Sequence, residues 1–88
     1  MDELIIRYHV NQDGLQEMFA MEQRFREAME PYGEFCGSGM GVVGKWNRDQ
    51  QFRGPSIELA KAAAKRFMES ERMECSFEIR PILESTDA

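Results

Sequence analysis

Histidine, cysteine and proline are scarce in this chain of 88 residues, which contains one histidine, two cysteines and three prolines. One histidine and two widely separated cysteines, Cys36 and Cys75, do not provide the ligand spacing of a metal site. We therefore expect no metal and no cofactor. Two cysteines also give little basis for a disulfide framework. Buried free thiols are the favoured interpretation, and a single disulfide is left open.

Long apolar runs are missing as well. No stretch approaches the ~20 apolar residues that a membrane-spanning helix needs, and the N-terminal residues do not resemble a signal peptide. We expect no membrane association and a cytoplasmic protein. With 42% hydrophobic and 31% charged residues the composition is that of a globular protein, and we expect residues 1–88 to form a single domain.

Positive charge is in the minority, because the net charge is −5. This balance makes nucleic acid an unlikely partner for the chain as a whole. The charge is unevenly distributed, however. Residues 1–34 carry eight acidic and three basic side chains, whereas residues 44–66 carry six basic and two acidic ones. A basic segment thus occupies the middle of an acidic chain.

Hydrophobic periodicity predicts two strands and two helices. Residues 3–10 alternate as a half-buried strand, and 73–83 do the same at the other end. Apolar spacing predicts a helix over 15–30, and Gly54-Pro55-Ser56 is typical of a second helix start. In the first helix the predicted inner stripe is Leu15, Met18, Phe19, Phe25 and Met29, with Met21 outside it as a contact residue. In the second helix it is Ile57, Ala60, Ala64, Phe67 and Met68.

Two further antiparallel strands fit between the helices, over residues 34–53. The order is then βαββαβ, which predicts a ferredoxin-like α+β sandwich: a four-stranded antiparallel sheet, two helices on one face and a glycine-rich central hairpin. The hairpin turn is placed either near 38–41 or at 47–50. The second position is preferred, because Trp46 and Phe52 would flank it.

Five of the seven glycines lie within residues 33–44, and Gly39-Met-Gly41-Val-Val-Gly44 matches the dinucleotide motif G-x-G-x-x-G. That motif must open a helix whose N-terminus faces the phosphates. Here the next predicted helix begins only near Ser56. A Walker-type loop fails too, since Trp46 follows Lys45 where a hydroxyl residue is required. We interpret the glycines as part of a bulged, twisted hairpin, in which glycine stands at positions where a larger side chain would collide.

Two groups of residues are candidates for binding. The central segment interleaves bases with aromatic residues, as single-stranded nucleic-acid platforms do. Its members are Lys45, Trp46, Arg48, Phe52 and Arg53. The alternative is that the aromatic residues are core and the bases a solvated strand edge. The second group lies on the sheet face that no helix would cover. It comprises Ile5, Arg7, His9, Glu78 and Arg80.

Catalytic chemistry is thinly represented. A contact between His9 and Glu78 on neighbouring strands would raise the histidine pKa, but no nucleophile is expected beside it other than Ser76. We predict a non-enzymatic protein-binding module, such as an inhibitor, adaptor or regulator, that uses its open sheet face or hairpin. Its partner would be another protein, with a homodimer possible, and acidic helix faces could imitate phosphate. The alternative is an anionic-ligand or nucleic-acid binder that uses residues 45–53.

Overall fold

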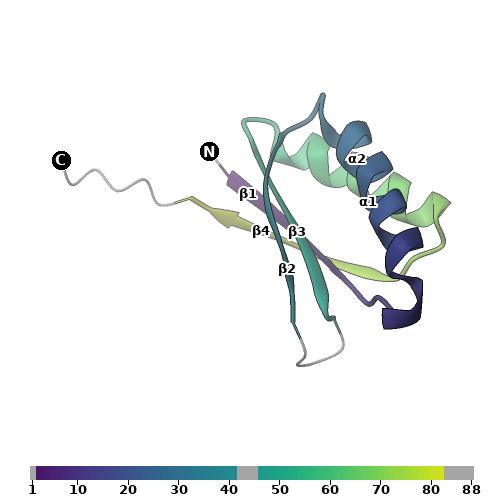
Figure 1. The fold of residues 1–88 in the computed structure, drawn as a ribbon. Helices are drawn as coiled ribbons and strands as arrows, with labels where there is room; N and C mark the ends of the chain where they lie inside the picture. The colour runs from purple at the N-terminus through teal and green to yellow at the C-terminus, as the bar shows by residue number, and fades with distance from the viewer. Residues whose placement is uncertain (1, 42–45, 83–88) are drawn as a thin grey trace.

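The computed structural model describes residues 2–41 and 46–82. Its elements are β1 (Asp2–Tyr8), a short 3-10 turn η1 (Gln12–Gly14), α1 (Leu15–Met29), β2 (Glu34–Met40), β3 (Arg48–Gly54), α2 (Ile57–Ser70) and β4 (Cys75–Pro81). The strands form one antiparallel sheet in the order β2-β3-β1-β4. Both helices lie on the same face of the sheet (Figure 1). The ferredoxin-like prediction is confirmed.

The core lies between this sheet face and the two helices. Alternation along β1 turns Leu4, Ile6 and Tyr8 toward the helices, and each is 0% exposed. From α1, Phe25 meets Phe52 of β3 edge-to-face, with ring centroids 5.5 Å apart. Burying a large apolar side chain of this kind contributes about 1.5–3 kcal/mol, so these residues dominate the stability of the domain.

Helix α1 is rotated relative to the predicted stripe. Its buried residues are Met18, Met21, Glu22, Phe25 and Met29. The predictions for Leu15 and Phe19 are wrong, because these side chains are 37% and 55% exposed. The prediction for Met21 is also wrong, since only 7% of it is exposed. The physical reason for the rotation is Glu22. This residue faces the sheet, but a search for apolar spacing passes over it because it is charged.

Helix α2 begins as its start signal predicts, directly after Ser56. Its buried positions are Ile57, Ala60, Ala64 and Met68. Phe67 packs partly buried against this core. The two alanines let the helix approach β1 closely. In the part of the chain that the structure describes, no helix is long and apolar enough to cross a membrane.

The β2–β3 hairpin differs from both predicted turns. Residues 38–40 belong to β2 and residues 48–50 to β3, so both turn positions are wrong. Beyond the ladder, the Gly41 amide donates to the Asn47 carbonyl at 2.8 Å. The Asn47 side chain in turn accepts from the Val10 amide at 2.8 Å and donates to the Val10 carbonyl at 3.0 Å. These bonds hold Asn47 against Val10, two residues after the end of β1, so the hairpin extends past the predicted positions.

The glycine run is bulged, as predicted, with a register shift between Phe35 and Gly37. Side-chain collision explains only some of the glycines in this run. A Cβ on Gly33 would lie 2.9 Å from the Arg53 carbonyl oxygen, whereas one on Gly37 or Gly41 would meet nothing within 4 Å. The collision prediction is therefore wrong for Gly37 and Gly41. The rest of the nucleotide-motif match, residues 42–44, lies outside the described residues.

Candidate functional site

A buried polar cluster joins α1 to the sheet. Arg48 of β3 forms a bidentate ion pair with Glu22 of α1, at 2.6 Å from Nη2 to Oε1 and 2.7 Å from Nε to Oε2. Tyr8 donates its hydroxyl hydrogen to the same carboxylate. Gln50 then donates from Nε2 to the Tyr8 hydroxyl at 3.1 Å. Glu22 and Gln50 are 1% and 0% exposed, so the cluster is shielded from water.

Each ionisable group of this cluster has a shifted pKa. Burial by itself would raise the pKa of Glu22, but the hydrogen bonds from Arg48 and Tyr8 outweigh it, and the pKa falls below its ordinary value. Burial and then the bond to Glu22 raise the pKa of Tyr8. The bond to Glu22 raises the pKa of Arg48. Glu22 and Arg48 are therefore both charged at neutral pH.

Shifted pKa values often mark catalytic sites, but this cluster is a structural one. Among the described residues, no buried side-chain nitrogen or oxygen lacks a hydrogen-bond partner. The pockets described below are lined by other side chains. Arg48 is 9% exposed and Phe52 is 1% exposed. The expectation that Arg48 is an exposed base is thus wrong, because Glu22 draws it into the interior.

The uncovered sheet face brings part of the second candidate group together. Arg7 Nη1 lies 2.7 Å from Glu78 Oε1, and Arg80 Nε lies 3.3 Å from Glu78 Oε2. The bond from Arg7 lowers the pKa of Glu78. His9 is exposed, and its Nε2 is 3.3 Å from Asn11 Oδ1. Glu78 thus contacts Arg7, and not His9 as predicted. Ile5, expected to be uncovered, is only 2% exposed.

The two remaining described residues of the central group, Trp46 and Arg53, lie in different surroundings. Lys45 lies outside the described residues. Arg53 is exposed on the open face, where the strand register places it opposite Glu3 and Glu34. Trp46 is half-buried and lines a pocket against α2 and β4. The four described members of the central group therefore do not form one surface, because strand alternation and burial divide them.

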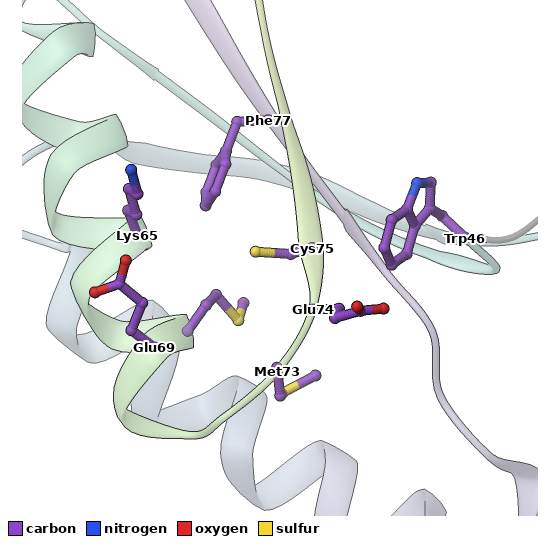
Figure 2. A pocket seen from close by; sticks show the side chains of 8 residues that line it. Trp46, Lys65, Glu69, Met73, Glu74, Cys75 and Phe77 are labelled. Atoms are coloured by element: carbon purple, nitrogen blue, oxygen red, sulfur yellow. The ribbon is translucent and has the colours of Figure 1, made fainter.

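The pocket between α2 and β4 has a volume of about 340 Å³. On α2, Lys65, Met68 and Glu69 share one face because they are three or four positions apart. On β4, Cys75 and Phe77 are two positions apart and so lie on the same face of the strand. Figure 2 shows both side chains directed toward Lys65 and Glu69. The full lining is Trp46, Lys65, Met68, Glu69, Met73, Glu74, Cys75 and Phe77. Apolar and sulfur-bearing side chains therefore form much of the wall, and charged groups lie around it.

The end of α2 builds one side of this pocket. Arg72 adopts a left-handed conformation with φ of 56°. Its amide donates to the Glu69 carbonyl at 3.0 Å, and the Met73 amide donates to the Met68 carbonyl at 2.9 Å. These two bonds form a Schellman motif, whose usual hydrophobic contact joins the positions of Met68 and Met73. The motif thus places both methionines in the pocket wall.

The pocket's electrostatics favour a protonated thiol. Burial raises the pKa of Cys75, and the nearby negative charge of Glu69 raises it further. Cys75 is thus a neutral, polarisable wall residue and not a thiolate nucleophile. A larger pocket of about 430 Å³ at the opposite end is lined mainly by turn residues around Pro31 and Pro55. The α2–β4 pocket is the stronger candidate because it combines an ammonium group, carboxylates, a thiol and an indole.

Sequence reasoning identified Trp46 but missed the rest of this pocket. It also missed Glu22 as the partner of Arg48. The signal for Glu22 was available, since it lies one turn from both Met18 and Phe25 on the inner stripe. No sequence pattern predicted the pocket. Lys65 and Phe77 line it together only because β4 lies at the edge of the sheet.

No protein-family model matches the sequence, and comparison with curated proteins gives no match either. Solved structures share the fold. A protein from Agrobacterium tumefaciens has a TM-score of 0.62 and 15% identity, covering 96% of this chain and 95% of its own. A NIPSNAP domain protein from Burkholderia xenovorans has a TM-score of 0.57 and 16% identity, covering 99% and 100%. A protein from Shewanella loihica, described as "a putative monooxygenase", has a TM-score of 0.58 and 10% identity, covering 96% and 95%.

The Shewanella protein overturns the prediction that this chain is not an enzyme. That prediction relied on a thin inventory of catalytic side chains, above all the single histidine. A chain of matching length and fold is nonetheless described as a monooxygenase, so the inventory alone does not exclude catalysis. The protein-binding and anion-binding roles stay predictions.

Proposed function

We propose that this protein is an enzyme that uses molecular oxygen to oxidise a small, largely apolar molecule held in the pocket between α2 and β4. The molecule itself supplies all four electrons, so that one oxygen atom replaces two of its hydrogen atoms and the other leaves as water. The observation that carries the proposal is the pocket itself. Its volume of about 340 Å³ falls within the range of small-molecule sites, which are mostly apolar with a few placed polar groups. The Shewanella protein of the same fold supports oxidation as the first reaction to test.

The lining residues suggest how such a molecule is held. Met68, Met73 and Phe77 supply apolar contact surface, and thioethers adapt to irregular shapes. Lys65 offers a cation to an acidic group on the ligand. Glu69 and Glu74 offer carboxylates that can accept a proton from it.

Trp46 is the single tryptophan of the chain and lines the pocket, so its fluorescence reports on occupancy. We would titrate the protein with anilinonaphthalene sulfonate, an apolar aromatic anion, and follow the quenching of Trp46 emission. Binding is expected to weaken about threefold to tenfold in Lys65→Ala, the effect of losing one partly exposed charge contact. Lys61→Ala, one turn earlier on the same helix, is the matched control and should bind as the unaltered protein does.

Oxidation is tested separately, by oxygen uptake with a panel of small molecules that quench Trp46. Uptake that depends on such a molecule, and that falls in Lys65→Ala but not in Lys61→Ala, supports the proposal. Quenching without oxygen uptake for any bound compound would leave a binding pocket and reject the oxidation. An unchanged Trp46 spectrum throughout would reject the pocket as the site.

A further inference from the structure

Strand β2 leaves one edge of the sheet open. It is an end strand, and among the described residues it pairs with β3 alone. After Glu34 it has no charged residue and no proline, and two of its positions are Gly37 and Gly39. The opposite end strand, β4, carries Glu78, Arg80 and a terminal proline. Charges and proline protect a strand edge from pairing with another chain, so β4 is protected and β2 is not.

Exposed apolar side chains gather beside the β2 edge. Among the described residues, five large hydrophobic side chains are exposed, and four of them belong to α1 or β2. We call these four the α1–β2 flank. Its members are Leu15, Phe19, Phe35 and Met40, at 37%, 55%, 37% and 52% exposure. Contiguous exposed apolar surface of this kind marks contact sites in soluble proteins.

The flank runs along the face of α1 that points toward β2. Positions 15, 19, 22 and 26 fall within a narrow arc at 3.6 residues per turn. From that arc the guanidinium carbon of Arg26 lies 4.1 Å from the centroid of the Phe35 ring. Glu22 reaches Arg48, the register partner of Met40. Phe19, one turn before Glu22, therefore lies toward the Met40 end of the strand.

We propose that a second copy of this chain occupies the β2 edge, with the two β2 strands pairing antiparallel about a two-fold axis. In the register that sets Ser38 opposite its own copy, Gly37 faces Gly39, so no large side chain obstructs the open face. The axis runs perpendicular to the sheet, which puts both α1 helices on the same side of the joined sheet. Each flank then covers the other.

Charge favours a second copy at this edge over other parts of the surface. The whole chain carries a net charge of −5, which repels a second copy in general. Residues 35–43 carry no charge, however. On the facing arc of α1, Glu22 is already paired with Arg48, and Arg26 adds a positive charge. The negative charge of the whole chain therefore does not oppose a second copy at the flank.

Sedimentation equilibrium over a wide range of protein concentrations tests this proposal. The expected result is a monomer–dimer equilibrium. Ser38→Lys puts like charges opposite each other across the seam, and Phe19→Lys removes the most exposed flank residue. Each should weaken dimerisation about tenfold or more. Leu59→Lys is the matched control, because Leu59 is 60% exposed but belongs to α2 and not to the flank; it should leave the dissociation constant unchanged.

Circular dichroism melts accompany each variant, and unchanged folding is expected because Ser38 and Phe19 are both exposed. A protein that stays monomeric at every concentration would overturn the proposal. So would a dimer that Ser38→Lys and Phe19→Lys leave intact, or one that dissociates in Arg80→Glu instead, since that result would assign the contact to the open sheet face.

Discussion

Replacing Glu22 with alanine would leave the Arg48 guanidinium buried without its carboxylate. Arg48 is 9% exposed and donates two hydrogen bonds, at 2.6 and 2.7 Å, to the Glu22 carboxylate. Among the described residues, its other hydrogen bond, from Nη1 to the Gly39 carbonyl oxygen, is long at 3.4 Å. Breaking a buried ion pair from one side costs about 3–5 kcal/mol. A domain of this size has a total stability of about 5–15 kcal/mol, so the variant should be close to unfolding.

Removing both charges together should be far less costly. In Glu22→Leu with Arg48→Met, no buried charge remains, and apolar replacements of a buried pair are often neutral or stabilising. The Tyr8 hydroxyl then still accepts the hydrogen bond from Gln50 but no longer donates one to Glu22. This loss costs about 1 kcal/mol of unfolding free energy. The double variant should therefore be more stable than Glu22→Ala by about 2 kcal/mol or more.

Urea denaturation followed by circular dichroism measures these free energies of unfolding, and Trp46 fluorescence gives a second probe of the same transition. A double-mutant cycle of Glu22→Leu, Arg48→Met and the pair isolates the coupling. If Glu22→Ala costs less than about 1 kcal/mol, or if the two single effects simply add, the ion pair is not buried in the way described here.

Three further outcomes are expected. Because the folded pKa of Glu22 lies below its ordinary 4.5, its stabilising contribution is complete above that pH and disappears as pH falls through the folded pKa; acid titration of stability should be flatter in Glu22→Gln. Arg72→Gly should raise the unfolding free energy by up to about 1 kcal/mol, since φ is 56° there, whereas Arg72→Ala should give no such gain in the same urea assay. Gly33→Ala should cost about 1–3 kcal/mol, because its Cβ would lie 2.9 Å from a backbone oxygen; in thermal melts Gly37→Ala should be nearly neutral.

The fold could be predicted from the sequence because local pattern and global topology agree. Leu4, Ile6 and Tyr8 alternate with polar residues, and the start of α2 carries its own proline signal. A βαββαβ order then leaves few ways to cover the apolar sheet face. The rotation of α1 could not be predicted in this way, because apolar counting excludes a glutamate. Only its pairing with Arg48 makes the burial of Glu22 favourable.

The candidate site could be predicted only in part. The alternation of bases and aromatic residues over 45–53 identified Trp46 as a binding residue. The pocket, however, depends on the end of α2 and on β4 being an edge strand. The left-handed conformation of Arg72 could not be predicted, because the residue in that conformation at a helix end is usually glycine. The predicted position of the hairpin turn was also wrong because of a contact that the sequence does not show. Polar turn-forming residues at 47–50 looked like a turn, while the Asn47 side chain in fact bonds to the backbone of Val10.

The basic middle segment shows why a charge sum along the sequence is not a surface potential. Arg48 is neutralised in the interior by Glu22, and Arg53 faces Glu3 and Glu34 on the two neighbouring strands. Reversing Arg48 to glutamate would bring two carboxylates together in the core, so lost anion binding in that variant would report unfolding. Arg53→Glu is the informative change, because Arg53 is exposed. Among the described residues 46–53, Arg53 is the one base that is exposed. Salt-dependent retention on heparin that survives Arg53→Glu would therefore leave no described base of residues 46–53 to support the anion-binding hypothesis.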